Sequence, residues 1–275
     1  MSQLDKALSF KNLHQGPQPL VMPNPWDVGT ARVLASMGFK ALATTSAGLA
    51  FAFGRKDAEN ALSRDEILRN AHDIVNASDL PVSADLENGF GDTPDAVAET
   101  IRMAVAIGLV GGSIEDATGR QESPIYAFDH AVERIAAAAE VVHGLPFPFM
   151  LTARAENFLN GRFDLDDTIR RLQAFEAAGA DVLFAPGLPD AEAIRLVCAS
   201  VSKPVSVVMG LKGTTYSVSQ LGDLGVRRIS LGSSLSRAAW GAFMRAAQEV
   251  QSMGTFSFSD QAIPFDVVNG MMIKG

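Results

Sequence analysis

Eight short apolar runs, each followed by an amphipathic segment, recur along the 275 residues at about 34 residues per unit. The runs are Leu20–Asp27, Ala41–Ala47, Pro81–Glu87, Gly111–Asp116, Phe149–Asn157, Asp181–Gly187, Pro204–Gly210 and Arg227–Ser233. The amphipathic segments repeatedly close on a glycine and an apolar residue, because glycine adopts the left-handed conformation that turns a helix end into the next strand. This alternation predicts a (β/α)8 TIM barrel, formed as a single domain by residues 1–275. An open doubly wound sheet is the weaker alternative, since no G-x-G-x-x-G turn follows the first run.

The composition indicates a small-molecule partner. A formal net charge of -8 and a pI near 5.0 argue against binding to nucleic acid or to an anionic membrane, since both require a basic surface. No apolar stretch approaches the roughly 18 residues of a membrane span, and the N-terminus lacks a basic segment followed by an apolar one. The single cysteine, Cys198, excludes an internal disulfide framework. We therefore expect a cytoplasmic protein.

Polar side chains gather at the C-terminal ends of the predicted strands, where barrels of this type carry their active sites. The closing residues are Asp27 on the first run, Thr44, Thr45 and Ser46 on the second, Asp85 and Glu87 on the third, Glu115 and Asp116 on the fourth, and Arg154 and Glu156 on the fifth. Because alternate strand residues point to the same side, Asp85 and Glu87 are expected to face one space. Buried like charges need a compensating cation or hydrogen-bond donors.

The residue types at these ends favour a hard cation and a small anion. Carboxylates without histidine or thiolate suit Mg2+, or Mn2+, rather than zinc. The planar fork of Arg154 matches a substrate carboxylate. A strand-end acid can instead cap the next helix, and for Asp27 and Asp116 that alternative stays open.

Four motifs in this order resemble the phosphoenolpyruvate mutase/isocitrate lyase superfamily across nearly the whole chain: "TTSAGLA", "ADLENGFG", "GGSIED" and "ARAENF". The resemblance implies a barrel in which Mg2+ binds together with the carboxylate and keto oxygens of a 2-oxo acid. By position, Asp85 matches the principal metal ligand. Glu87, Glu115 and Asp57 match acids that bind the metal or its waters.

The resemblance also implies the substrate contacts. Ser46 and the backbone of Ala47 and Gly48 match the turn that grips the substrate carboxylate, and Thr44 stands where the family often has an aromatic residue. The expected substrate-binding residues are Thr44, Ser46, Ala47, Gly48, Asp85 and Arg154. Arg154 and Glu115 are also expected to take part in catalysis.

The loop after Asp116 departs from the family pattern. Isocitrate and methylisocitrate lyases carry "K-[KR]-C-G-H" there, with a cysteine as acid-base catalyst, whereas this chain reads "ATGRQESPIYAFD". Those two activities are therefore not expected. Arg120 and Ser123 substitute only in part for the lysine and Asn-Ser pair of the mutases. If a side chain protonates an enolate, the loop offers Glu122 and Tyr126.

The leading hypothesis is a Mg2+-dependent lyase or decarboxylase that cleaves a C–C bond of a small 2-oxo acid through a metal-stabilised enolate. One alternative is phosphonomutase or other phosphonate C–P chemistry, for which Leu231–Ser236 could offer helix N-terminal amides. Another is a catalytically silent 2-oxo-acid binder. A Schiff-base aldolase ranks lower, because Lys203 and Lys212 only flank the seventh run.

The C-terminal tail lies beyond the eighth unit. Residues 254–275 are apolar and are expected to add a helical segment to the barrel. In the resembled family a C-terminal helix often crosses to a neighbouring subunit of a tetramer. We therefore expect a homo-oligomer, a dimer or tetramer, in which this tail packs on a neighbour.

Overall fold

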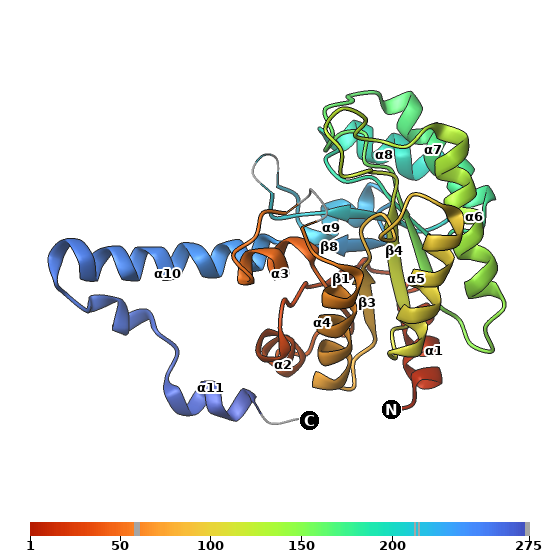
Figure 1. The fold of residues 1–275 in the computed structure, drawn as a ribbon. Helices are drawn as coiled ribbons and strands as arrows, with labels where there is room; N and C mark the ends of the chain where they lie inside the picture. The colour runs from red at the N-terminus through yellow and green to blue at the C-terminus, as the bar shows by residue number, and fades with distance from the viewer. Residues whose placement is uncertain (58–60, 212, 214, 273–275) are drawn as a thin grey trace.

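The structure is a computed structural model that describes residues 1–57, 61–211, 213 and 215–272. Eight parallel strands form one sheet that curls into a nearly closed barrel surrounded by helices (Figure 1). The strands are β1 Leu20–Met22, β2 Leu42–Ala43, β3 Val82–Asp85, β4 Gly111–Glu115, β5 Met150–Arg154, β6 Val182–Phe184, β7 Val205–Val208 and β8 Arg228–Ser230. They pair in the order β1-β8-β7-β6-β5-β4-β3-β2. A backbone hydrogen bond of 3.1 Å, from Ala43 N on β2 to Pro23 O just after β1, links the two edges of the sheet. The predicted (β/α)8 barrel is confirmed.

Helices surround the strands, and most of those between strands begin at a side-chain cap, the helix at Phe128–His143 being an exception. They are α1 Gln3–Leu13, α2 Val28–Ser36, α3 Ser46–Ala52, α4 Arg64–Ala77, α5 Pro94–Ala106, α6 Phe128–His143, α7 Leu165–Ala177, α8 Ala191–Ala199, α9 Val218–Asp223, α10 Ser234–Met253, the 3-10 helix η1 Ser257–Gln261 and α11 Phe265–Met271. For α4, Ser63 accepts from the backbone of Glu66, whose carboxylate accepts from Ser63 N. Such caps fix where each loop leaves the barrel rim.

Several strands are shorter than the apolar runs that predicted them. β1 ends at Met22, before two prolines, and Asp27 caps α2 by accepting from Thr30 N at 2.7 Å. The helix-cap alternative is therefore right for Asp27. Thr45 likewise caps α3, so β2 does not reach Ser46. β3 ends at Asp85, and Glu87 lies beyond the strand at a φ of 48°, so strand alternation does not place it. The two acids nevertheless line one cavity, as predicted.

Strand alternation does place the other key residues. Ala84 and Ala153 belong to the large core between the strands and the helices, so Asp85 and Arg154, the next residues, face the barrel interior. At the N-terminal end of the barrel, Phe10 of α1 packs with Met22 and Met150. The sequence analysis did not predict this helix, which closes the barrel opposite the polar rim.

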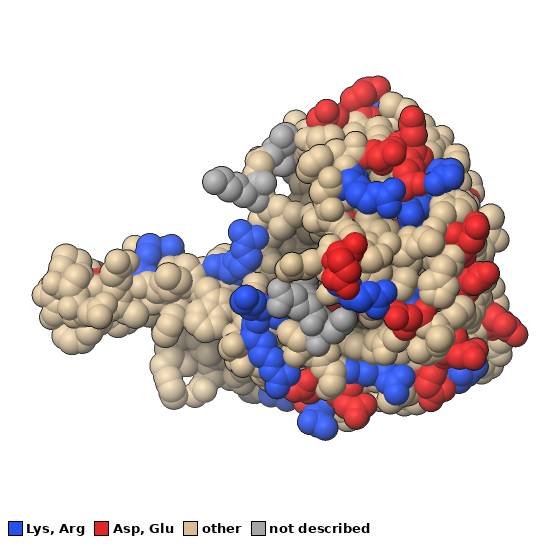
Figure 2. Space-filling view, turned by 45° about the horizontal axis from the view of Figure 1, so that its top comes forward, with Lys and Arg blue, Asp and Glu red and all other residues tan. Residues whose placement is uncertain are grey.

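The C-terminal segment forms an arm of α10, η1 and α11 (Figure 1). α10 extends away from the barrel, and the chain then turns back so that α11 reaches α2, where Arg32 Nη1 donates to Met272 O at 2.5 Å. Figure 2 shows its surface as largely uncharged, whereas charged residues are spread over the barrel. Exposed large apolar side chains on the arm are Trp240, Phe243, Met244, Val250, Met253, Phe256, Phe258, Ile263, Phe265, Val267 and Val268. The expected extra helical segment is present over residues 254–272, and residues 273–275 lie outside the described ranges. None of the described helices, α10 included, is long and apolar enough to cross a membrane.

Candidate functional site

A cavity of about 370 Å3 opens at the C-terminal ends of the strands, a size that suits a small organic ligand. Its described lining includes five carboxylates and two guanidinium groups. These are Asp57, Asp85, Glu87, Glu115, Glu156, Arg154 and Arg228. Because carboxylates outnumber guanidinium groups, a bound cation would stabilise the cavity.

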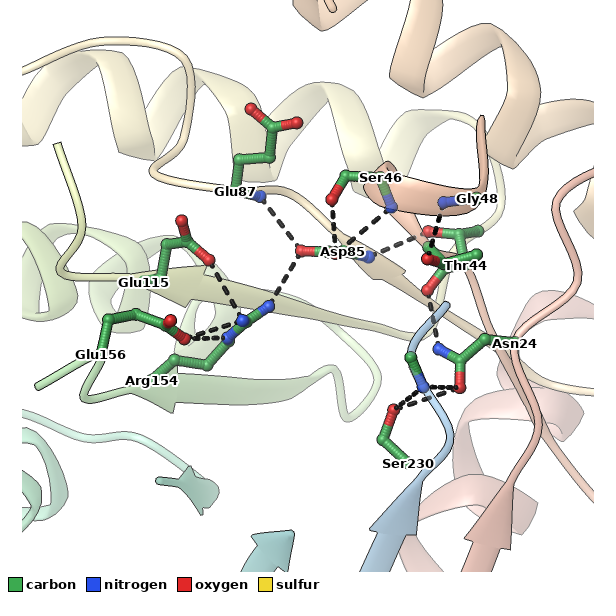
Figure 3. Close-up of polar contacts among 12 residues, drawn as sticks. Asn24, Thr44, Ser46, Gly48, Asp85, Glu87, Glu115, Arg154, Glu156 and Ser230 are labelled. Carbon is green, nitrogen blue, oxygen red and sulfur yellow. Dashed lines mark hydrogen bonds and ion pairs between the residues drawn. The ribbon is translucent and has the colours of Figure 1, made fainter. Parts of the chain in front are cut away.

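Arg154 lies at the centre of the acidic group (Figure 3). Its Nη1 is 3.2 Å from Asp85 Oδ1, and its Nη2 is 3.3 Å from Glu115 Oε2 and 2.7 Å from Glu156 Oε1. Its Nε also donates to Glu156 Oε1 at 2.8 Å. One guanidinium thus compensates three carboxylates, which explains in part why a buried strand can end in acids.

Asp85 is held from both sides. Its Oδ2 accepts hydrogen bonds from Ser46 Oγ at 3.0 Å and from Ser46 N at 3.3 Å, while its own backbone N donates to Thr44 Oγ1 at 2.9 Å. The predicted residues Thr44, Ser46, Asp85 and Arg154 therefore meet in one network. Ala47 and Asp57 also line the cavity.

Glu87 stands apart from this network. In Figure 3 its carboxylate points away from Arg154, and only its backbone N contacts Asp85 Oδ1, at 3.4 Å. Burial, together with the negative charges of Asp85 and Asp57, raises the pKa of Glu87 to about 8. A cation bound nearby would favour the ionised form of Glu87.

Glu115 and Glu156 are disfavoured as anions in the same way. Burial raises the pKa of Glu115 well above its usual range, although Arg154 opposes the shift, and burial also raises the pKa of Glu156.

Asp116 supports the chain next to the cavity. The backbone N of Glu156 donates to Asp116 Oδ1 at 2.8 Å, and Asp116 Oδ2 accepts from the buried Arg171 at 3.0 Å. Asp116 therefore acts as a structural anchor beneath Glu156.

The donor set fits a divalent cation. Asp85, Glu87, Glu115 and Asp57 supply only oxygen ligands, and a bound cation would lower the pKa values that burial now raises. Within the described ranges, no three acidic, histidine or cysteine side chains converge at coordination distance. In this conformation Arg154 provides the compensating charge instead.

Some predicted residues do not reach the cavity. Glu122 is exposed on its loop, and the Tyr126 hydroxyl donates to Asp92 Oδ1 at 2.6 Å outside the cavity. Burial and this hydrogen bond raise the pKa of Tyr126 to about 12, which makes it a poor proton donor at neutral pH. The Gly48 amide donates to Thr45 Oγ1 at 3.1 Å, because Thr45 caps α3, and Gly48 does not line the cavity.

The amides considered for phosphate and the lysines considered for a Schiff base are not placed for those roles. Asn24 Oδ1 accepts from the backbone amides of Leu231 and Gly232, at 2.9 and 3.0 Å, and so occupies amides proposed for phosphate. Lys203 is exposed at the N-terminal end of β7, opposite the cavity, and Lys212 lies outside the described residues.

Asn24 and Arg228 are among the cavity residues that sequence reasoning missed. Asn24 joins three elements, since it also donates to Thr44 O at 2.9 Å and accepts from Ser230 Oγ at 3.1 Å. Its position between two prolines was the available signal. Arg228 is a charged residue inside an otherwise apolar strand, a pattern that normally marks a specific role.

Comparison with known proteins identifies the family. The family model for phosphoenolpyruvate phosphomutase matches residues 10–251. A solved structure from Burkholderia cenocepacia J2315, provisionally assigned as a lyase/mutase, is 57% identical, covers 98% of this chain and 95% of its own, and superposes with a TM-score of 0.95.

Two curated relatives are more distant. The 2-methylisocitrate lyase of Halalkalibacterium halodurans is 28% identical over 92% of this chain and 85% of its own length. The oxaloacetate decarboxylase of Paraburkholderia xenovorans is 27% identical over 78% of this chain and 71% of its own. This chain belongs to the phosphoenolpyruvate mutase/isocitrate lyase superfamily of carbon–carbon lyases and mutases.

Proposed function

We propose that this protein is a Mg2+-dependent lyase or decarboxylase that cleaves a C–C bond of a small 2-oxo acid. The observation that carries the proposal is the group of Asp85, Glu87 and Glu115 around Arg154, in a cavity of about 370 Å3 at the barrel rim. Mn2+ would suit the same ligands.

In this proposal Asp85 holds the cation, and Glu87, Glu115 and Asp57 hold it or its waters. When bound, Mg2+ would act as a Lewis acid that polarises the keto group and stabilises negative charge on its oxygen. Ser46 keeps Asp85 in place through two hydrogen bonds. The charge of the acids is then compensated, and their carboxylate forms become favourable.

Arg154 is the proposed partner of the substrate carboxylate. Glu156 fixes the guanidinium through Nε and Nη2, and Asp116 fixes Glu156 in turn. Nη1 and Nη2 also face Asp85 and Glu115, so a substrate carboxylate placed among them can share these donors. The arginine would orient the acid with its reacting bond toward the cavity opening.

The reaction is one that needs no thiol. The chain's only cysteine, Cys198, lies on α8, and burial raises its pKa to about 11. Decarboxylation starts without a base, and an oxaloacetate decarboxylase is among the relatives. The 2-methylisocitrate lyase relative shows that a larger substrate occurs in the family, but the loop cysteine expected for that reaction is replaced here.

Phosphonate C–P chemistry is the second candidate. It is favoured by the family model, which describes a phosphomutase, and by the lyase/mutase assignment of the 57% identical structure. Inorganic phosphate and phosphonoacetate should then compete with oxalate for the cavity. Failure of both to compete would exclude this candidate.

We also propose that the arm of residues 234–272 packs on a neighbouring subunit. Its many exposed apolar side chains form a larger surface than monomers usually leave in water. A dimer or tetramer would cover it.

Turnover of a panel of small 2-oxo acids with Mg2+ tests the proposed activity. Asp85→Ala should lower kcat/KM at least about 100-fold, because it removes the principal ligand. Asp95→Ala, an exposed acid of α5, is the control and should leave turnover unchanged. Tight binding with no turnover of any acid would favour the silent binder instead.

A further inference from the structure

Arg228 is a buried cation on the floor of the cavity. The residue is 3% exposed, yet it lines the cavity together with Ser230 and Asn24. Its Nη1 donates to Thr152 Oγ1 on β5 at 2.8 Å. Its side chain therefore crosses the barrel interior from β8 toward β5.

Arg228 has no acidic partner among the described residues. None of the ion pairs in these ranges involves it, and its Nε is buried without a hydrogen-bond acceptor. Burial, followed by the charge of Arg154, lowers the pKa of Arg228 to about 10. An unpaired buried guanidinium is costly, so an anion that enters the cavity would relieve that cost.

The two arginines of the cavity lie at successive levels. Thr152, the partner of Arg228, precedes Arg154 by two residues on β5, and both side chains face the interior. Two residues of strand advance by about 6.6 Å, so Thr152, which accepts the hydrogen bond from Arg228, joins the strand about that far below Arg154. A short carbon chain with an oxyanion at each end matches a step of this size.

We propose that Arg228 binds a second carboxylate of the substrate, which makes the substrate class a small dicarboxylic 2-oxo acid. The inference rests on the proposed function for the first carboxylate, which Arg154 would hold at the upper level.

Succinate and butyrate are the probes, since they share a four-carbon chain and differ in the second carboxylate. Their dissociation constants are measured by calorimetry, once with Mg2+ and once with EDTA. We expect wild type to bind succinate about 10- to 100-fold more tightly than butyrate, the worth of a charge-assisted hydrogen bond. Arg228→Met should abolish the preference, whereas Arg228→Lys should keep most of it.

Arg195→Met, at an exposed arginine of α8, is the matched control and should keep the full preference. Melting curves without ligand show whether Arg228→Met is folded, and Arg228→Gln replaces it if it is not. Equal affinities in wild type, or a preference that survives in a folded neutral variant, would overturn the proposal and leave Arg228 a structural cation. Pyruvate is titrated in the same way, with Mg2+ and with EDTA, to test the proposed function separately. If the preference for succinate depends on Arg228 but Mg2+ does not strengthen pyruvate binding, the proposed function fails and the Arg228 subsite stands.

Discussion

Mg2+ binding should release a proton from Glu87. Its pKa of about 8 reflects burial next to Asp85 and Asp57, so the carboxyl group is about 90% protonated at pH 7 in the metal-free protein. A cation requires the carboxylate, and the proton must leave when it binds. The affinity for Mg2+ should rise about 50-fold from pH 6 to pH 8 through this group, and then level off.

Calorimetric titrations of Mg2+ in two buffers of different ionisation enthalpy give the number of protons released. Wild type should release about 0.9 more protons at pH 7 than Glu87→Gln, which cannot ionise. The reasoning is refuted if the variant and wild type release the same number.

The same group affects the stability of the metal-free protein. A carboxyl pKa raised from 4.5 to about 8 on folding contributes stability that is fully present below pH 4.5. That contribution is lost as the pH rises through about 8, so melting temperatures in EDTA should fall across this window, and fall less in Glu87→Gln.

Three further predictions concern other parts of the chain. Asp116→Asn should cost about 1.5–3 kcal/mol of unfolding free energy in chemical denaturation, because it removes one of the two carboxylates that pair with the buried Arg171, the other being Asp167. Glu192→Gln in an exposed pair should cost under about 1 kcal/mol. A small loss for Asp116→Asn would contradict its role as an anchor. Glu122→Gln should leave turnover unchanged, because this side chain is exposed outside the cavity, and a fall in kcat would restore it to the reaction. Replacing Phe243 on the arm by Asp should shift the oligomer toward monomer in sedimentation velocity, and an unchanged oligomer would show that the arm is not the interface.

The sequence allowed the barrel and its acidic rim to be predicted, because both depend on local patterns. Apolar runs and glycine turns recur along the chain, and parallel strands bring their C-terminal residues to one end. Asp85, Glu115 and Arg154 were found in this way, and they do meet.

The remaining features depend on contacts between distant residues. Asn24 matters because it joins the end of β1 to residues 44 and 230–232, and no local pattern encodes that junction. The turn that carries Glu87 away from Arg154 follows from its left-handed backbone, which the strand pattern concealed. Tyr126 was available in sequence as a proton donor, but the fold pairs it with Asp92.

Calorimetric titration of oxalate, a planar mimic of a pyruvate enolate, shows whether the cavity is a metal-dependent 2-oxo acid site. Wild type and the control Asp95→Ala should bind oxalate with Mg2+ and lose most of that affinity in EDTA, while Asp85→Ala should bind weakly under both conditions. Binding that is independent of Mg2+ and unaffected by Asp85→Ala, or no binding by wild type at all, would contradict the account of a metal-dependent 2-oxo acid site.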